Sequence, residues 1–203
     1  MVDGSITIGS DEVGWGAVAG SLYVVGVAMP SNWRFRGLQD SKKYKGKNAR
    51  ANREAIFEPL LKEVKGCWAL AIFSAEQVDT LGAQHCLIEA HTSVLQQLVS
   101  RVPRQNIERV IVDGKLRLPK VPTAVAIPEA DSHFQVVSAA SVIAKVLHDD
   151  AMMALANSYP QYGFDEHMGY GTPAHMKAIR KHGMCPMHRR SYLKRDNLNH
   201  ETA

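Results

Sequence analysis

The sequence has few cysteines and no apolar run long enough to cross a membrane. Its 203 residues include three cysteines, Cys67, Cys86 and Cys185, which form no CxxC pair, so neither a disulfide framework nor a structural zinc site is expected. The longest apolar run, residues 22–29, has the length of one strand and falls far short of the ~20 residues of a membrane helix. The first residues lack the basic start and apolar stretch of a signal peptide. These absences predict a cytoplasmic protein with no membrane partner.

Positive charge exceeds negative charge only slightly, but it is concentrated. The 24 Lys and Arg residues against 20 Asp and Glu give a net charge of +4. Eight of the basic residues lie within 34–53, where Asp40 is the only acid, and seven lie within 177–195, where there is none. Two separate basic stretches favour a polyanionic partner. From charge alone, a solvated surface without a ligand stays an open alternative.

Short β-rich runs come first, and strands alternate with helices further on. Residues 5–10, 21–29 and 67–74 are predicted strands whose succession favours an antiparallel meander. Two more strands are predicted at 109–113 and 123–127, and helices at 47–64, 84–99, 136–159 and 172–181. A chain with 45% hydrophobic residues can bury a full core. We therefore predict an α/β fold, a mixed sheet flanked by helices with a C-terminal helical extension.

Four acids lie where predicted strands end or a predicted helix begins. Asp11 and Glu12 follow the first strand, Asp113 ends a later one, and Asp131 precedes the longest helix. Carboxylates at the ends of apolar strands are unfavourable unless they are hydrated, paired or metal-bound. Adjacent strands could place Asp11 beside Asp113, whereas Glu12 would point to the other face unless the chain turns at the glycines that follow. Oxygen ligands favour Mg²⁺ or Mn²⁺. From spacing alone, ordinary loop positions, or a helix cap at Asp131, remain equally open.

Five segments resemble, in the same order, those of type 2 ribonucleases H, in particular bacterial ribonuclease HII. They are IGSDEVGWGAVAG at 8–20, LQDSKKYKGKNARANREAIF at 38–57, IVDGK at 111–115, ADSHFQVVSAASVIAKVLHDD at 130–150, and YPQYGFDEHMGYGTPAHMKAIRKHGMCPMHRRSY at 159–192. The resemblance implies a ribonuclease H-like fold in one compact unit. Residues 1–159 would form the catalytic domain, and 160–203 a helical substrate-binding region with a polar tail.

The resemblance also implies a reaction. Asp11, Glu12, Asp113 and Asp131 match the catalytic acids of the family, which bind Mg²⁺ or Mn²⁺. The implied protein is a monomeric endoribonuclease that cuts the RNA strand of RNA–DNA hybrids, or ribonucleotides embedded in duplex DNA. It would leave 5′-phosphate ends through two-metal-ion catalysis. A catalytically weak nucleic-acid-binding member of the same fold is the alternative, although all four acids are present.

The resemblance also implies substrate contacts for residues in three of the five segments, 8–20, 38–57 and 159–192. The backbone of Gly14 and Gly16 would approach the ribonucleotide, because glycine permits close approach and positive φ, and a backbone group there could read the 2′-OH. The remaining implied contacts are from Lys42 and Lys43 to phosphates, from Tyr170 to the sugar beside the scissile bond, and from Arg189 and Arg190 to the nucleic-acid backbone.

The chain departs from the family pattern at two arginine positions. Trp15 stands where the family has arginine between the two glycines, so we expect substrate recognition, and not metal binding, to differ. His148 stands where arginine is usual, and we expect only an altered surface charge. Among the other histidines, His85 and His91 are expected to be structural or exposed. His133 is a candidate to face the substrate or assist proton transfer.

Overall fold

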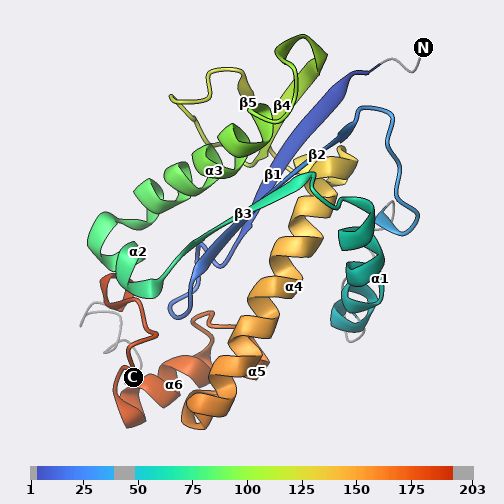
Figure 1. Ribbon diagram of the computed structural model, residues 1–203. Helices are drawn as coiled ribbons and strands as arrows, with labels where there is room; N and C mark the ends of the chain where they lie inside the picture. Colours follow the sequence, from blue (N-terminus) through green and yellow to red (C-terminus); the bar gives the residue numbers. More distant parts are fainter. Residues whose placement is uncertain (1–3, 39–48, 194–203) are drawn as a thin grey trace.

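Five strands form one mixed sheet in the computed structural model, which describes residues 4–38 and 49–193 (Figure 1). The spatial order is β3-β2-β1-β4-β5. Antiparallel pairs join β1 to β2 and β2 to β3, whereas β1 pairs in parallel with β4, and β4 with β5. The predicted meander and mixed sheet are thus confirmed. The strands are β1 (Ile6–Val13), β2 (Leu22–Pro30), β3 (Trp68–Phe73), β4 (Ile107–Asp113) and β5 (Ala124–Ile127).

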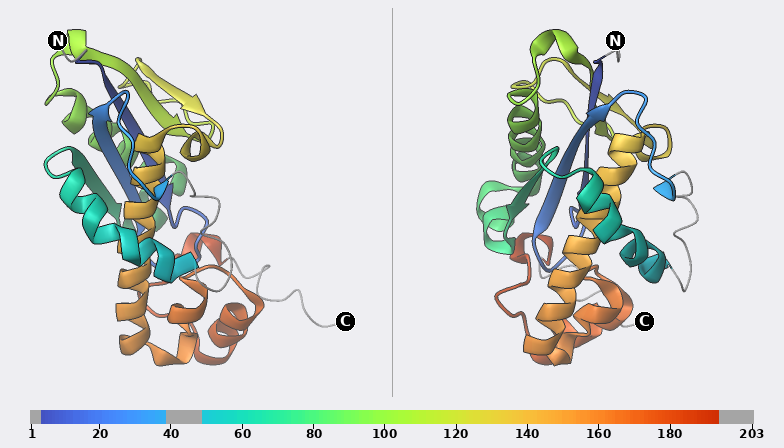
Figure 2. Two further views of the ribbon diagram at one scale, coloured as in Figure 1. Left: turned by 90° about the vertical axis from the view of Figure 1, so that its right-hand side faces the viewer. Right: turned by 45° about the vertical axis from the view of Figure 1, so that its right-hand side comes forward.

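Helices cover both faces of this sheet (Figure 2). The long helix α4 and helix α1 pack on one face, and α3 packs on the other. The four predicted helices are present, and α6 begins at Pro173 with Thr172 as its N-cap. The short helix α2 was not predicted; Ser74 and Gln77 form a capping box at its start. The helices are α1 (Ala49–Glu63), α2 (Ala75–Leu81), α3 (Ala83–Val99), α4 (Gln135–Ser158), α5 (Phe164–His167) and α6 (Pro173–His182).

Side chains of β1 alternate between the two helical layers, as the pleat of a strand requires. Ile8 belongs to the core beneath α3, and Val13 to the core beneath α4. Gly9 lies directly against α4: a Cβ there would come within 2.7 Å of methyl groups of Val136 and Val137. This close approach of strand and helix requires glycine. It also brings the residues that follow on the same face of β1 close to α4.

The C-terminal segment forms a smaller core at the lower end of the molecule in Figure 1. It contains α5 and α6 and packs on the end of α4 and on the loop after β1. The Val18 and Ala19 amides both donate to the Gly169 carbonyl, and Ala19 forms an isolated β-bridge with His188. The C-terminal segment is therefore bound directly to the chain that leaves β1. No described helix is long and apolar enough to cross a membrane.

Candidate active site

Two of the predicted acids lie side by side on the sheet. In the parallel pair of β1 and β4, Ser10 is opposite Val112, so the next residues, Asp11 and Asp113, are neighbours at the carboxyl ends of the two strands. Asp131 lies in the 3₁₀ turn Ala130–Ser132 just before α4. It does not cap that helix, whose N-cap is Phe134 with no side-chain hydrogen bond.

Burial and mutual repulsion raise the pKa of both strand carboxyls. Asp11 is only 8% exposed. Burial, with the nearby Glu12 and Asp113 carboxylates, raises the pKa of Asp11 to about 8, although hydrogen bonds from the Ser141 side chain and the Glu12 amide oppose the rise. Burial also raises the pKa of Asp113, as do the Asp131 and Glu12 carboxylates. These acids are close enough to repel one another and would ionise more readily beside a cation.

Glu12 lies at the boundary between the two faces of the sheet. The first strand does not end at Asp11 but continues to Val13, so the Glu12 side chain turns towards α3. There its Oε2 is 3.2 Å from Nε2 of His91, whose Nδ1 is 2.9 Å from the Ser10 hydroxyl. His91 is fully buried, so of the two expected alternatives, structural or exposed, the structural one applies to it. Its place within the apolar stripe of α3, three residues before Val94, was the available signal.

A pocket of about 230 Å³ opens beside these acids. It connects Glu12 and Asp131 with residues of α1 and α4 and with Tyr170. The Ser138 hydroxyl on its wall is buried and has no hydrogen-bond partner among the described residues. The pocket is lined by Glu12, Val13, Arg53, Asp131, Ser138, Ser141, Val142, Lys145 and Tyr170.

The same pocket holds two cations that sequence reasoning did not single out. Lys145 donates to Asp149 at 2.8 Å, and Arg53 approaches the other oxygen of that carboxylate at 3.5 Å. The Lys145 ammonium also lies 6.0 Å from the centre of the Tyr170 ring. The four-residue spacing of Lys145 and Asp149 on a predicted helix was the local signal for this pair. Both cations are thus held at the pocket by one buried carboxylate.

The glycine turn, residues 14–17, lies beside Tyr170. Gly14 has a φ of +81°, as expected, and its amide forms a hydrogen bond that opposes the rise in the Tyr170 pKa caused by burial. Gly16 has no positive φ. A Cβ at Gly16 would meet no atom within 4 Å, so this corner is open. Trp15 is 44% exposed and Tyr170 is 37% exposed.

One of the expected substrate contacts, that of Arg189, does not fit its place in the structure. Arg189 is fully buried, and its guanidinium donates to the carbonyls of Gly20 and Trp15. It is therefore not available to a phosphate, and that prediction is wrong. Arg190 is exposed, as a backbone contact requires. Lys42 and Lys43 lie outside the described residues.

Two histidine expectations are settled by burial and position. His148 is fully buried, 3.4 Å from Asp149, so the expectation of an altered surface charge is wrong: position 148 is on the inward side of α4. His133 is exposed and lines a different hollow, one that none of the four acids borders. The structure therefore does not bring His133 into the acid pocket.

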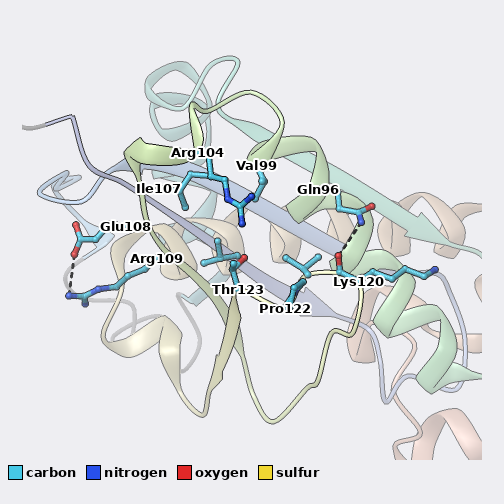
Figure 3. Close-up of a pocket in the computed structure, with 11 residues that line it drawn as sticks. Gln96, Val99, Arg104, Ile107, Glu108, Arg109, Lys120, Pro122 and Thr123 are labelled. Atoms are coloured by element: carbon cyan, nitrogen blue, oxygen red, sulfur yellow. Dashed lines mark hydrogen bonds and ion pairs between the residues drawn. The ribbon is translucent and has the colours of Figure 1, made fainter.

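A larger hollow, of about 470 Å³, lies between α3 and the β4–β5 region (Figure 3). Gln96 donates to the Lys120 carbonyl at 3.3 Å on its wall, and Arg109 pairs with Glu108 at 3.2 Å. None of the four acids lines it. This larger hollow is therefore separate from the pocket beside the four acids.

Comparison with known proteins agrees with this geometry. The family model described as Ribonuclease HII matches residues 8–195. The ribonuclease HII of Neisseria meningitidis serogroup C (strain 053442) is 37% identical over 196 residues, 95% of each chain. That of Cupriavidus necator is 40% identical over 187 residues, 91% of this chain and 74% of that one. In the solved PCNA:RNase HII complex from Archaeoglobus fulgidus, a chain 23% identical superposes with a TM-score of 0.70, covering 97% of this chain and 98% of that chain, and so shares the fold. The chain therefore belongs to the ribonuclease HII family, and its activity is that of a ribonuclease H.

Proposed function

We propose that the chain hydrolyses the RNA strand of RNA–DNA hybrids, ribonucleotides embedded in duplex DNA, or both, and leaves 5′-phosphate ends. The observation that carries the proposal is the grouping of Asp11, Asp113 and Asp131 beside a pocket that also contains Glu12 and Tyr170. These acids come from two parallel strands and from the turn before α4. The glycine turn borders Tyr170, and this supports the proposal that its backbone groups read a ribose 2′-OH.

The proposed cofactor is Mg²⁺ or Mn²⁺, held by Asp11, Glu12, Asp113 and Asp131. The donor set fits a hard divalent ion, because every ligand atom is a carboxylate oxygen. The raised pKa values of Asp11 and Asp113 also fit, since a cation would relieve the repulsion that raises them. No group of three His, Cys, Asp or Glu among the described residues is already arranged to hold an ion, so the carboxylates must rotate towards it. When bound, such ions supply an activated water and stabilisation of the leaving 3′ oxygen.

Neighbouring groups of the chain orient the carboxylates. The Ala130 amide donates to Asp113 Oδ1 at 2.6 Å, and the Glu12 amide donates to Asp11 Oδ1 at 2.8 Å. His91 holds Glu12 from the opposite face of the sheet. These hydrogen bonds fix the orientation of the carboxylates, as the partners of metal-binding carboxylates do in proteins.

Tyr170 and the two cations of the pocket are suited to the substrate. The half-exposed ring of Tyr170 offers a flat surface to a sugar. Lys145 and Arg53 line the same pocket and can neutralise a phosphate that lies over it. Arg190 is exposed on the C-terminal segment, and in the proposal it also binds the nucleic-acid backbone. The proposal keeps Lys42 and Lys43 as further phosphate contacts.

Cleavage of three labelled duplexes tests the proposed substrate. The protein is incubated with Mg²⁺ or Mn²⁺ and with an RNA–DNA hybrid, a DNA duplex containing one ribonucleotide, or plain DNA. We expect cleavage of either or both of the first two with 5′-phosphate products, and no cleavage of plain DNA. Binding without cleavage would identify a catalytically weak nucleic-acid-binding member of the family. Equal cutting of plain DNA would identify a nuclease that does not depend on the 2′-OH.

The substitution Asp11→Asn tests the acids. It removes a ligand charge and should lower kcat by orders of magnitude at saturating Mg²⁺. Thermal unfolding of both proteins in EDTA separates loss of a ligand from loss of the fold, and the variant should stay folded because the raised pKa of about 8 keeps Asp11 largely uncharged at neutral pH without metal. Asp165→Asn is the matched control, since Asp165 is exposed on α5, and it should leave kcat unchanged. Near wild-type activity in Asp11→Asn would show that the assignment is wrong.

We also propose that the protein acts as a monomer in the cytoplasm. The described cysteines Cys67, Cys86 and Cys185 are all free thiols, which suits a reducing compartment. Size-exclusion chromatography with light scattering would measure the mass in solution, and 22.4 kDa is expected for a monomer.

A further inference from the structure

The backbone carbonyl of Trp15 accepts two hydrogen bonds from the C-terminal segment. Arg189 Nη1 and the Tyr192 hydroxyl each donate to it at 2.9 Å. We propose that Arg189 and Tyr192 are positioning residues that hold the glycine turn so that the Gly16 amide faces the substrate. The inference rests on the proposed function, because it gives that turn the task of meeting the ribonucleotide.

The geometry of a β-turn explains why this carbonyl matters. The Ala17 amide donates to the Gly14 carbonyl at 3.2 Å, so Trp15 and Gly16 are the two corner residues. The peptide group that joins them is planar and trans, with its C=O and N–H pointing in opposite directions. Because the Trp15 carbonyl points at the C-terminal segment, the Gly16 N–H points away from it. A Cβ at Gly16 would meet nothing within 4 Å, so the space beside its Cα is open to a ligand.

Arg189 is placed to hold the whole loop and not just one atom. Its Nε donates to the Gly20 carbonyl at 3.0 Å, while Nη1 reaches Trp15. The guanidinium thus binds both ends of the segment between β1 and β2, which its rigid fork of donors suits. Burying a cation is unfavourable, and here the Nη2 atom has no hydrogen-bond partner among the described residues. A fully buried arginine at this place indicates that fixing the loop outweighs that penalty.

Arg189 and Tyr192 together form a clamp on the Trp15 carbonyl. The Asp79 carboxylate on α2 anchors the residues beside it. Asp79 Oδ2 accepts from the Arg190 amide at 2.7 Å, and Oδ1 accepts from the Ser191 amide at 2.9 Å and its hydroxyl at 2.6 Å. Partial burial alone would raise the pKa of Asp79, but the hydrogen bonds from Ser191 and Arg190 hold it low. Asp79 therefore fixes the 3₁₀ helix Arg190–Tyr192. Because Tyr192 belongs to this short helix, its hydroxyl is held at the Trp15 carbonyl.

The substitution Tyr192→Phe removes one hydrogen bond of the clamp and leaves the ring, which lies 5.4 Å from the Arg189 guanidinium carbon. Tyr162→Phe is the matched control: its hydroxyl also donates to a backbone carbonyl, that of Gly183, at 2.8 Å, but far from the turn in the sequence. Both proteins are compared with wild type in thermal unfolding, hydrogen–deuterium exchange of residues 14–20, and kcat/KM on the duplex with one embedded ribonucleotide.

We expect Tyr192→Phe to exchange faster at residues 14–20 and to lose roughly threefold to tenfold in kcat/KM, as one hydrogen bond allows. Tyr162→Phe should change neither the exchange at residues 14–20 nor kcat/KM. Thermal unfolding should show that both variants are folded at the assay temperature. Unchanged exchange at 14–20 in Tyr192→Phe, or an equal loss of kcat/KM in both variants, would overturn the inference. If wild type cleaved no substrate, the proposed function would fail, whereas the exchange measurement would still decide whether the clamp orders the turn.

Discussion

The side chain of Trp15 is free although its backbone is held. The carbonyl is bound by Arg189 and Tyr192, and the indole is 44% exposed. An arginine at this position could pair with a phosphate through charge-assisted hydrogen bonds. Tryptophan offers no charge, but it has a large flat face that can stack on a sugar or base. The difference therefore concerns how the substrate is held and leaves the carboxylates unaffected.

The substitution Trp15→Arg should increase affinity and favour a single embedded ribonucleotide over a continuous RNA tract. A single ribonucleotide depends most on contacts at the turn, so the ratio of kcat/KM on that duplex to kcat/KM on the hybrid should rise severalfold. Steady-state kinetics on both substrates measure it. Trp15→Phe, which keeps an aromatic face without charge, should leave the ratio near that of wild type. Equal ratios in wild type and Trp15→Arg would show that Trp15 has no part in substrate choice.

The two departures from the family pattern meet at one turn. A Cβ on Gly14 would come within 2.9 Å of His148 Nε2, so the histidine packs directly beneath the turn that carries Trp15. The Tyr23 ring lies edge-on to His148 at 5.7 Å. The resemblance implies arginine at both positions in relatives, so we expect less positive charge around this turn than they have.

At the scale of elements, the packing of β1 against α4 sets the position of the acids. Gly9 and Asp11 lie on the same face of β1, and the Ser141 side chain of α4 binds Asp11. The helix can approach this closely only because position 9 has no side chain: the nearest methyl groups would be 2.7 Å from a Cβ. Separation of strand and helix would therefore move Ser141 away from the buried Asp11 carboxyl.

The substitution Gly9→Ala should destabilise the protein by about 1–3 kcal/mol, because the added methyl overpacks the β1–α4 contact. Urea denaturation should show a lower midpoint, and the cleavage rate should fall as Ser141 moves from Asp11. Gly16→Ala is the control for stability, since its added Cβ meets no atom within 4 Å. An unchanged midpoint in Gly9→Ala would contradict the tight packing of strand and helix.

At the scale of the whole molecule, a chain of neutral imidazoles joins the C-terminal segment to the site. The Cys185 amide donates to His188 Nδ1 at 2.9 Å, so the His188 proton lies on Nε2, which faces His175 Nε2 at 3.1 Å. His175 must then donate from Nδ1 to the Tyr170 carbonyl at 2.9 Å. Burial lowers the pKa of His175 to about 4 and lowers that of His188. The hydrogen bond between His188 and His175 thus requires a neutral His175, because its Nε2 must accept the proton of His188.

Acid should weaken this chain and with it the protein. Between the folded pKa of His175, about 4, and its ordinary value of 6.5, the unfolded state binds more protons. The free energy of unfolding therefore rises with pH in that window, and the contribution is complete above pH ~6.5 and lost towards pH ~4. The pKa of Asp11 is raised from 3.8 to about 8, so without metal Asp11 makes the free energy of unfolding fall with pH. Comparing wild type with a variant that keeps Asp11 cancels this contribution.

The comparison is between wild type and His175→Gln, denatured with urea at several pH values from 5 to 7.5 in EDTA. Wild type should lose more stability on acidification than the variant, by up to about 1.4 kcal/mol per pH unit for one such group. His85→Gln is the control, because His85 is exposed on α3, and it should keep the wild-type slope. Identical slopes in wild type and His175→Gln would show that His175 is not held neutral by the fold.

Local patterns of the sequence predicted the five strands and the helices α1, α3, α4 and α6, but not α2 or α5. Alternation along β1, an apolar strand ending in Asp113, and the Thr172–Pro173 start of α6 are local patterns, and local physics decides them. Because side chains of a strand alternate, the pattern also predicted that Asp11 and Asp113 could be neighbours and that Glu12 would face the other way. The ordered motifs predicted the family, which the comparisons confirm.

What each polar side chain binds depends on contacts between segments far apart in the chain. His91 meets Glu12 across 79 positions of the chain, and Arg189 meets the Trp15 carbonyl across 174. No periodicity in a short window encodes such pairs, because they depend on which helix covers which face of the sheet. The basic stretch around Arg189 predicted a surface position for it. Instead, its side chain is buried and donates to the backbone carbonyls of Trp15 and Gly20. The same reason places His148 beneath Gly14: burial follows from packing between distant segments and not from residue type.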